Sequence, residues 1–365
     1  MKINGKNFYF VNAAKILFAL IVVMLALSIL GQTIAFNGND SAIQKHIAKL
    51  FFGVIIMSVI SSVHIKIWEN FAYVFYLFAF VFLVIVELLG VVRLGAQRWI
   101  NLYVFMFQPS ELMKLSLILA LARYYSSLSI TELKTLKCHY FPLLLTMIPA
   151  LLIMKQPDLG TALLLIGVGV GMSFLAGFPF KPFCYAIAGV ICSCPIAWYN
   201  LHDYQKNRIL NFLDPDRDPL GTGYHVLQSK IAIGSGHIFG KGLFKGTQSN
   251  LNFLPEKHTD FIFTTITEEF GFIGAVFIIL LFLSLIMYFF WVSSESKNKF
   301  SKHLGNGIAL LLFFHVFVNI GMVIGVLPVV GIPLPFLSYG GSSMITFMIA
   351  TGLIISALAR IYRKY

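Results

Sequence analysis

The sequence predicts an all-α, polytopic integral membrane protein with about ten transmembrane helices. The first observation is its composition, since 58% of the residues are hydrophobic and only 12% are charged. The second is a mean hydropathy of +0.84, outside the range of soluble globular proteins. The third is a series of apolar runs, each long enough to cross a bilayer at about 20 residues. We interpret residues 1–365 as a single transmembrane domain.

The apolar runs define the predicted spans, which lie at 10–36, 47–64, 71–92, 109–126, 141–154, 160–178, 183–199, 262–292, 306–329 and 339–360. The first run follows Lys2 and Lys6 and lacks a small-residue cleavage site, so it predicts a retained anchor. The division between the sixth and seventh spans depends on the proline-containing turn at 178–182.

A large extracytoplasmic loop, 200–261, is predicted between the seventh and eighth helices. The stretch 214–221 is rich in Asp, Pro and Gly and predicts turns. Tyr224–Ile233 predicts a short amphipathic helix on the membrane surface. The glycines that follow permit close backbone approach, but their spacing matches no nucleotide-binding motif.

The distribution of basic residues predicts that both termini are cytoplasmic. With this orientation the short cytoplasmic segments contain Lys2, Lys6, Lys66, Arg123, Lys134, Lys137, Lys181, Lys297, Lys299, Lys302, Arg360, Arg363 and Lys364. The short outer segments contain only Lys45, Lys49, Arg93, Arg98 and Lys155. The loop 200–261 and its acidic residues then face outward.

The net charge of +12 does not indicate nucleic-acid binding. About half of the basic residues lie where membrane topology requires them, and no nucleic-acid-binding motif is present. The four cysteines predict neither a disulfide framework nor a metal site.

The stretch 252–271 is the strongest candidate for chemistry, because four carboxylates lie where the outer loop enters an apolar segment: Glu256, Asp260, Glu268 and Glu269. Ionisable groups at a membrane border are costly and are candidates for function by default. Thr259 or Asp260 is expected to cap the following helix. The alternative is that these acids are only helix caps and solvated loop ends.

Two further outer segments also carry charge at predicted helix starts. Pro109 in the first turn of one helix places Glu111 and Lys114 one turn apart, where they can form an ion pair; a purely structural pair is the alternative. Asp158, beside Lys155, has the pattern of an ordinary N-cap.

The segment 328–343 contains prolines and glycines at membrane depth. Such a broken segment predicts a wall of an outward cavity. The histidines of the long loop and of the carboxylate stretch, His225, His237 and His258, have no metalloprotease spacing and are interpreted as structural or supporting residues.

Four motifs together resemble the SEDS family (shape, elongation, division and sporulation proteins): residues 108–114 (QPSELMK), 156–161 (QPDLGT), 254–263 (LPEKHTDFIF) and 328–343 (PVVGIPLPFLSYGGSS). The resemblance extends over nearly the whole chain. Residues 214–236 and 245–249 are more similar to the members that act in cell elongation than to those that act in division. His237 departs from the pattern, where a glycine is expected.

The resemblance implies an inverting peptidoglycan glycosyltransferase that polymerises lipid II into glycan strands at the outer face of the bacterial cytoplasmic membrane. The Asp of the LPEKHTDF motif, Asp260, is implied to be the catalytic residue. We expect the following residues to bind substrate: Arg98, Trp99, Lys114, Lys155, Asp158, Lys245, Glu256, His258 and Ser338. Glu111, Glu268 and Glu269 are expected to support the site.

Cations must stabilise the leaving diphosphate, and Arg98, Lys114, Lys155 and Lys245 are the candidates. A divalent cation, Mg²⁺ or Mn²⁺, could share this task, and the sequence leaves the metal open. The resemblance implies a class B penicillin-binding protein with transpeptidase activity as partner, together with other membrane proteins of the elongation complex. The alternative functions are a lipid II flippase or a non-catalytic scaffold of the cell-wall synthesis complex.

Overall fold

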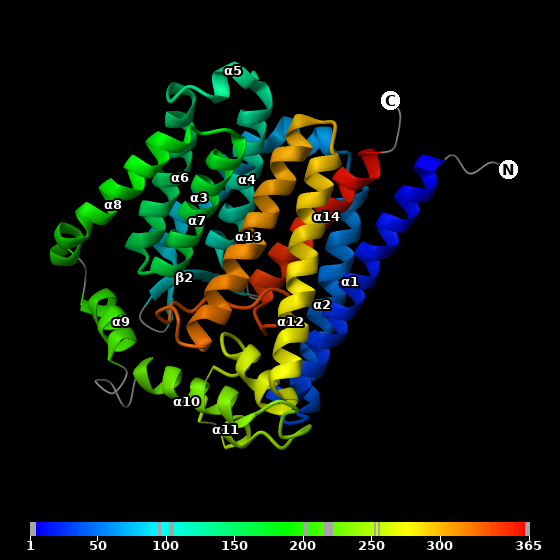
Figure 1. The fold of residues 1–365 in the computed structure, drawn as a ribbon, viewed down its shortest axis with the longest axis vertical. Helices are drawn as coiled ribbons and strands as arrows, with labels where there is room; N and C mark the ends of the chain where they lie inside the picture. Colours follow the sequence, from blue (N-terminus) through cyan, green and yellow to red (C-terminus); the bar gives the residue numbers. More distant parts are fainter. Residues whose placement is uncertain are drawn as a thin grey trace.

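The computed structural model describes residues 5–93, 96–101, 106–200, 203–214, 222–251, 253–254 and 256–361. It is a helical bundle whose two ends carry different elements (Figure 1). The first turn of α1 and the last turn of α14 lie at one end, and a small sheet and the helices α9–α11 lie at the other. We call the second end the loop end. The predicted turns at 215–221, and Pro255, lie outside the described residues.

Eight of the described helices are long and apolar enough to span a membrane. They are α1 (Gly5–Ala35), α2 (Asp40–Ser62), α3 (Ile65–Leu89), α6 (Lys137–Lys155), α7 (Leu159–Ala176), α12 (Ile262–Glu295), α13 (Lys299–Val323) and α14 (Gly341–Ile361). Two further helices, α4 (Pro109–Ser127) and α8 (Phe180–Asn200), occupy the two remaining predicted spans. The all-α polytopic architecture is therefore confirmed.

Several helices begin before their apolar runs do. The run predicted at 47–64 becomes a helix that begins at Asp40, because the side chain of Asn39 accepts a hydrogen bond from the Ala42 N–H and caps it. The run predicted at 306–329 becomes α13, capped by Asn298 at its start and ended near Gly325, whose φ is +76°. The apolar run predicts the part in lipid, and polar caps extend the helix beyond it.

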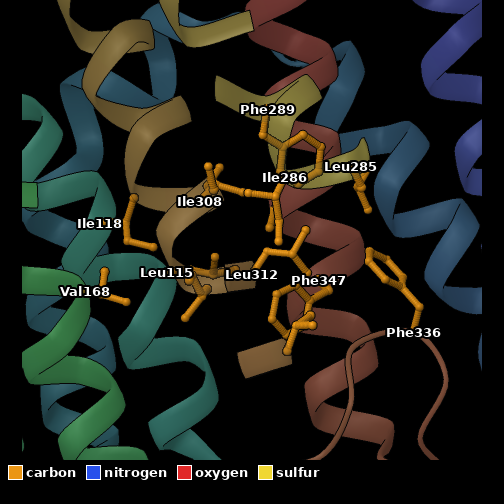
Figure 2. Packing of buried hydrophobic residues seen from close by; sticks show 14 of the residues in the cluster. Leu115, Ile118, Val168, Leu285, Ile286, Phe289, Ile308, Leu312, Phe336 and Phe347 are labelled. Atoms are coloured by element: carbon orange, nitrogen blue, oxygen red, sulfur yellow. The ribbon is translucent and has the colours of Figure 1, made fainter. Parts of the chain in front are cut away.

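The core surrounds α13, which packs against α4, α7 and α12. Figure 2 shows side chains from these helices, from α14 and from the broken segment 328–343 meeting there; those labelled are Leu115, Ile118, Val168, Leu285, Ile286, Phe289, Ile308, Leu312, Phe336 and Phe347. Fourteen of the 19 residues of α4 are buried, so this helix is enclosed largely by protein rather than by lipid. A helix surrounded by protein can carry the charges of Glu111 and Lys114.

A three-stranded antiparallel sheet at the loop end was not predicted. Its strands are β1 (Val91–Arg93), β2 (Ala96–Asn101) and β3 (Met106–Phe107), in the order β1-β2-β3. Strands this short carry no readable alternation of apolar and polar residues, so sequence periodicity could not detect them. The sheet sets the position of Arg98 and Trp99 beside the helix starts.

In its described residues, the long loop contains three helices: α9 (Asp203–Leu213), α10 (Thr222–Ser235) and α11 (Thr247–Asn250). The prediction of a helix at Tyr224–Ile233 is confirmed by α10. The four-residue helix α5 (Ile130–Leu133) lies at the opposite end of the bundle (Figure 1).

Two of the loop glycines, Gly236 and Gly240, lie against the backbone of α12. α12 breaks at Gly271, where φ is +67°, and a Cβ on Gly240 would collide with the carbonyl of Glu269. The freed N–H groups after the break pair with the loop, since Phe272 N donates to His237 O at 2.9 Å. The loop is thereby attached to the first turns of α12.

Candidate active site

A cavity of about 410 Å³ opens at the loop end of the bundle. It is lined by the sheet, the first turns of α4 and α7, α9, the turn before α12, α13 and the broken segment 328–343. The lining residues are Arg98, Trp99, Gln108, Glu111, Lys114, Asp158, Thr161, Leu164, Arg208, Glu256, Thr259, Asp260, His315, Val330, Gly331, Ile332, Pro333, Gly340, Ser342 and Ser343. The prediction that 328–343 forms a wall of the cavity is confirmed.

Asp260 lies in the turn 256–261 and faces this cavity, half-buried. It does not cap α12, as the sequence had suggested for Thr259 or Asp260, because the N-cap residue is Phe261 and makes no side-chain cap bond. Its side chain faces Gly331, where an added Cβ would lie 3.4 Å from Asp260 Oδ2. Within the described part of the chain, no donor bonds its carboxylate.

Burial of Asp260, together with the negative charges of Glu256 and Asp158, raises the pKa of its carboxyl to about 7, while Arg208 opposes the shift. A carboxyl with a pKa near neutrality can accept a proton at physiological pH and release it again. Asp260 therefore has the protonation behaviour of a general base.

Glu111 and Lys114 form the ion pair that the sequence predicted, with Lys114 Nζ 2.8 Å from Glu111 Oε1. The same Nζ lies 2.9 Å from His315 Nε2 on α13, which was not predicted. Because an ammonium group only donates, His315 Nε2 accepts and its proton is on Nδ1, 3.4 Å from Pro333 O. All three charged or titratable side chains are buried, so this group joins α4, α13 and the broken segment inside the protein.

Asp158 caps α7 as predicted, since its Oδ1 accepts from the Thr161 N–H at 3.2 Å. Its Oδ2 lies 3.7 Å from Arg98 Nε. Arg98 also donates to the carbonyls of Gln156 and Pro157. The predicted residues from two separate loops are thus joined in one wall.

Four of the predicted substrate-binding residues lie outside the cavity lining. Lys155 and Lys245 are exposed. The ring of His258 stacks on that of Phe36, with centroids 3.9 Å apart. Ser338 is buried, and its hydroxyl donates to Thr259 O at 2.6 Å. None of these four side chains lines the space around Asp260.

Glu268 and Glu269 also lie away from the cavity and face the loop 240–250. Glu268 accepts hydrogen bonds from Lys241 Nζ, Thr247 Oγ1, Gln248 N, Ser249 N and Ser249 Oγ. Glu269 Oε2 accepts from Phe244 N at 3.0 Å. Both carboxylates therefore organise the loop.

Three lining residues with nitrogen-bearing side chains were not singled out from the sequence: Gln108, Arg208 and His315. Gln108 belongs to the QPSELMK motif, which drew attention to Glu111 instead. Arg208 is one of several basic residues in the long loop, and His315 is a lone histidine in an apolar helix. Neither has a local pattern that indicates a site, and only the fold brings them to the cavity.

The described residues contain no group of three or more His, Cys, Asp or Glu side chains placed to hold a metal ion. Cationic side chains are present instead, and Arg98, Lys114 and Arg208 all line the cavity. The arrangement combines a proton acceptor with positive charge, which suits transfer from an anionic leaving group.

Comparison with known proteins agrees with this fold. Residues 6–363 match the family model described as "Cell cycle protein", which covers FtsW, RodA and SpoVE. The chain is 40% identical over 341 residues to "Peptidoglycan glycosyltransferase MrdB" of Escherichia coli strain K12, covering 92% of each chain. It is 36% identical over 314 residues to "Stage V sporulation protein E" of Bacillus subtilis strain 168, covering 83% of each.

Solved structures show the same architecture. One, described as "Structural coordination of polymerization and crosslinking by a peptidoglycan synthase complex", superposes with a TM-score of 0.83 at 32% identity, covering 95% of this chain and 98% of the other. The crystal structure of the rod shape determining protein RodA of Thermus thermophilus gives a TM-score of 0.72 at 25% identity, covering 95% and 97%. The chain therefore belongs to the FtsW, RodA and SpoVE family, the SEDS family that its motifs resemble, and is most similar to the RodA/MrdB branch.

Proposed function

We propose that this protein is a peptidoglycan glycosyltransferase that polymerises lipid II into glycan strands for cell elongation and rod shape. The observation that carries the proposal is Asp260, a carboxyl with a pKa of about 7 facing a cavity that also contains Arg98, Lys114 and Arg208. The E. coli relative, which aligns over 92% of each chain, bears the name of this activity.

Asp260 is the general base in this proposal. Its carboxylate removes the proton from the acceptor sugar hydroxyl, whose oxygen attacks the anomeric carbon of the donor. The bond from that carbon to the lipid diphosphate breaks, and the diphosphate leaves with the electron pair. Because the donor is α-linked and the polymer β-linked, one direct displacement with inversion suffices, without a sugar–enzyme intermediate.

Arg98 and Arg208 are the preferred cations for the leaving diphosphate. Both line the cavity, whereas Lys155 and Lys245 are exposed outside it. Lys114 is only 1% exposed and already paired with Glu111, so its role is to stabilise the wall. Trp99, Asp158 and Glu256 line the remaining space and contact substrate. His258, Ser338, Glu268 and Glu269 support the site from outside the cavity.

The loop end faces the outside of the cell in this proposal, and both termini face the cytoplasm, as the basic residues predict. Two exposed positions test this: Asn207 on α9, and Ser294 near the end of α12. In a cysteine-free background, a membrane-impermeant thiol reagent should label Asn207→Cys in intact cells and Ser294→Cys only after lysis. The reverse pattern would place the cavity on the wrong side for lipid II polymerisation.

A class B penicillin-binding protein that crosslinks the new strands is the proposed partner, within a complex that contains other elongation proteins. Support comes from the solved relative described as part of a synthase complex that coordinates polymerization and crosslinking. Co-purification of the two membrane proteins in detergent is the direct test.

Reconstitution of the purified protein in liposomes with lipid II separates the candidate functions. A glycosyltransferase yields glycan polymer, and the Asp260→Asn variant yields almost none. Translocation of lipid II without polymer would indicate a flippase. Neither product, with or without the partner, would indicate a scaffold and overturn the proposal.

A further inference from the structure

The backbone of the turn that carries Asp260 is held by side chains from three separate parts of the chain. Three consecutive carbonyls each accept one side-chain hydrogen bond. Gln32 Nε2 on α1 donates to His258 O at 3.0 Å, Ser338 Oγ donates to Thr259 O at 2.6 Å, and Asn319 Nδ2 on α13 donates to Asp260 O at 2.9 Å.

Each of these three side chains also bonds the opposite wall of the cavity, the broken segment 328–343. Gln32 Nε2 donates to Leu337 O at 2.7 Å, and Asn319 Nδ2 donates to Ile332 O at 2.7 Å. Ser338 belongs to that segment, and its Oγ accepts from Leu334 N at 2.8 Å. We call Gln32, Asn319 and Ser338 the carbonyl clamp.

The clamp is buried, and its two amides retain an unfavourable feature. Gln32 and Asn319 are both 0% exposed and Ser338 is 3% exposed. The oxygens Gln32 Oε1 and Asn319 Oδ1 have no hydrogen-bond partner within the described residues. A buried polar atom without a partner costs about 1–3 kcal/mol. The folded protein is therefore less stable by this amount for each amide, but both amide nitrogens remain hydrogen-bonded to backbone carbonyls.

The clamp has a direct geometric consequence for Asp260. No donor bonds its carboxylate within the described residues, so the position of the turn's backbone sets the region that the carboxylate can reach. The clamp connects that backbone to the segment that contains Gly331, directly across from the carboxylate. The bonds from these side chains to both walls, together with the backbone bond from Tyr339 N to His258 O at 2.8 Å, set the distance between the two walls.

We propose that Gln32, Asn319 and Ser338 are positioning residues that hold the Asp260 carboxylate at the correct distance from the acceptor hydroxyl. This inference rests on the proposed function of Asp260 as the base. The three residues touch no substrate, and they act through the backbone carbonyls of residues 258–260. A displacement of about 1 Å at a reacting group can cost on the order of 100-fold in rate, so small shifts of the turn are sufficient to matter.

Ser338→Ala is the primary test, because it removes only the hydroxyl oxygen and therefore creates at most a small void. Ser356→Ala is the matched control: Ser356 Oγ is also buried and donates to a distant carbonyl, Val63 O, at 2.7 Å, but at the opposite end of the bundle. Both variants lose the same kind of bond. Ser338→Thr retains the hydroxyl and is expected to recover most of the activity.

Steady-state polymerisation of lipid II by folded, monodisperse protein gives the readout. Ser338→Ala should lower kcat about tenfold or more and leave KM nearly unchanged, because substrate contacts are intact. The acid limb of its kcat profile should also move to lower pH, since a loosened turn lets water reach the carboxylate. Ser356→Ala should keep the wild-type kcat and profile. Asn319→Leu and Gln32→Met should follow Ser338→Ala.

Asp260→Asn, measured alongside, separates the two proposals. If Asp260→Asn is inactive while Ser338→Ala matches Ser356→Ala in kcat and pH profile, the clamp is overturned and the base assignment stands. If Asp260→Asn polymerises at the wild-type rate, the base assignment and the clamp both fail. A loss of yield in Ser338→Ala with normal kcat per folded molecule also overturns the positioning role.

Discussion

Asp260 and Glu268 belong to the same acidic stretch, and the fold gives them opposite environments. Glu268 is 0% exposed, and its two oxygens accept from Lys241, Thr247, Gln248 and Ser249. Asp260 faces the cavity with its backbone held and its carboxylate bonded by no donor in the described structure.

The difference between the two acids distinguishes a carboxylate with a structural role from one with a catalytic role. A carboxylate whose oxygens already accept several bonds has little capacity left for a substrate, and it stabilises the loop that supplies its donors. A carboxylate held through its main chain keeps its oxygens available. The two environments therefore predict different consequences when each acid is replaced.

The largest effect is expected for Asp260→Asn. The amide keeps the size of the side chain and cannot accept the proton, so polymerisation should fall by about 100- to 10,000-fold. Yield and membrane insertion should stay normal. Asp40→Asn, the same change at an exposed position at the start of α2, is the control and should remain active. Near-normal polymer from Asp260→Asn would move attention to Asp158 or Glu111.

The Glu111–Lys114 pair should stabilise the wall of the site and take no part in the reaction. Glu111→Ala leaves a buried Lys114 without its carboxylate, and breaking a buried pair costs about 3–5 kcal/mol. Folded yield and activity should therefore both fall. The double variant Glu111→Leu, Lys114→Met should recover yield, measured by fluorescence-detected size-exclusion chromatography. Normal yield with no activity in Glu111→Gln would instead assign Glu111 to catalysis.

Glu268→Gln should destabilise the protein with little effect on chemistry. The new NH₂ group faces donors, so at least one buried bond is lost at a cost of about 1–3 kcal/mol. The melting temperature should drop, while the activity of the folded fraction stays close to wild type. Glu295→Gln, at the exposed end of the same helix, provides the control. A selective loss of kcat in Glu268→Gln would remove the contrast with Asp260.

Titration should distinguish Asp260 by two smaller effects of opposite sign. The base works as the carboxylate, so kcat/KM should fall about tenfold per pH unit below the pKa of about 7. Stability should change in the other direction, because the pKa is raised from 3.8 on folding. That contribution is fully present below pH 3.8 and is lost as pH rises towards 7.

Thermal unfolding of wild type and Asp260→Asn at two pH values measures the second effect. The variant carries no ionisable group at this position. The melting temperature of Asp260→Asn should therefore exceed that of the wild type by more at pH 8 than at pH 5. An equal difference at both pH values would mean that Asp260 is already ionised freely in the folded protein.

The sequence alone determined the features that depend on local physics. Apolar length located the spans, Pro109 and Asp158 marked the starts of α4 and α7, and helical spacing predicted the Glu111–Lys114 pair. The motifs also drew attention to Asp260. Each of these signals lies within a few residues along the chain, where helix geometry already determines which side chains can be in contact.

Only the tertiary structure decided which acids face the cavity. Apart from the motif that marks Asp260, Glu268 and Asp260 carry the same kind of signal in the sequence, a carboxylate at a membrane border. The difference between their environments arises from a loop that folds back on α12. Arg208, His315 and the carbonyl clamp come from segments far apart in the chain, so no local pattern marks them. A hydrogen bond such as that from Gln32 to the carbonyl of His258 forms only when helices pack, because packing alone brings such distant atoms within 3.0 Å.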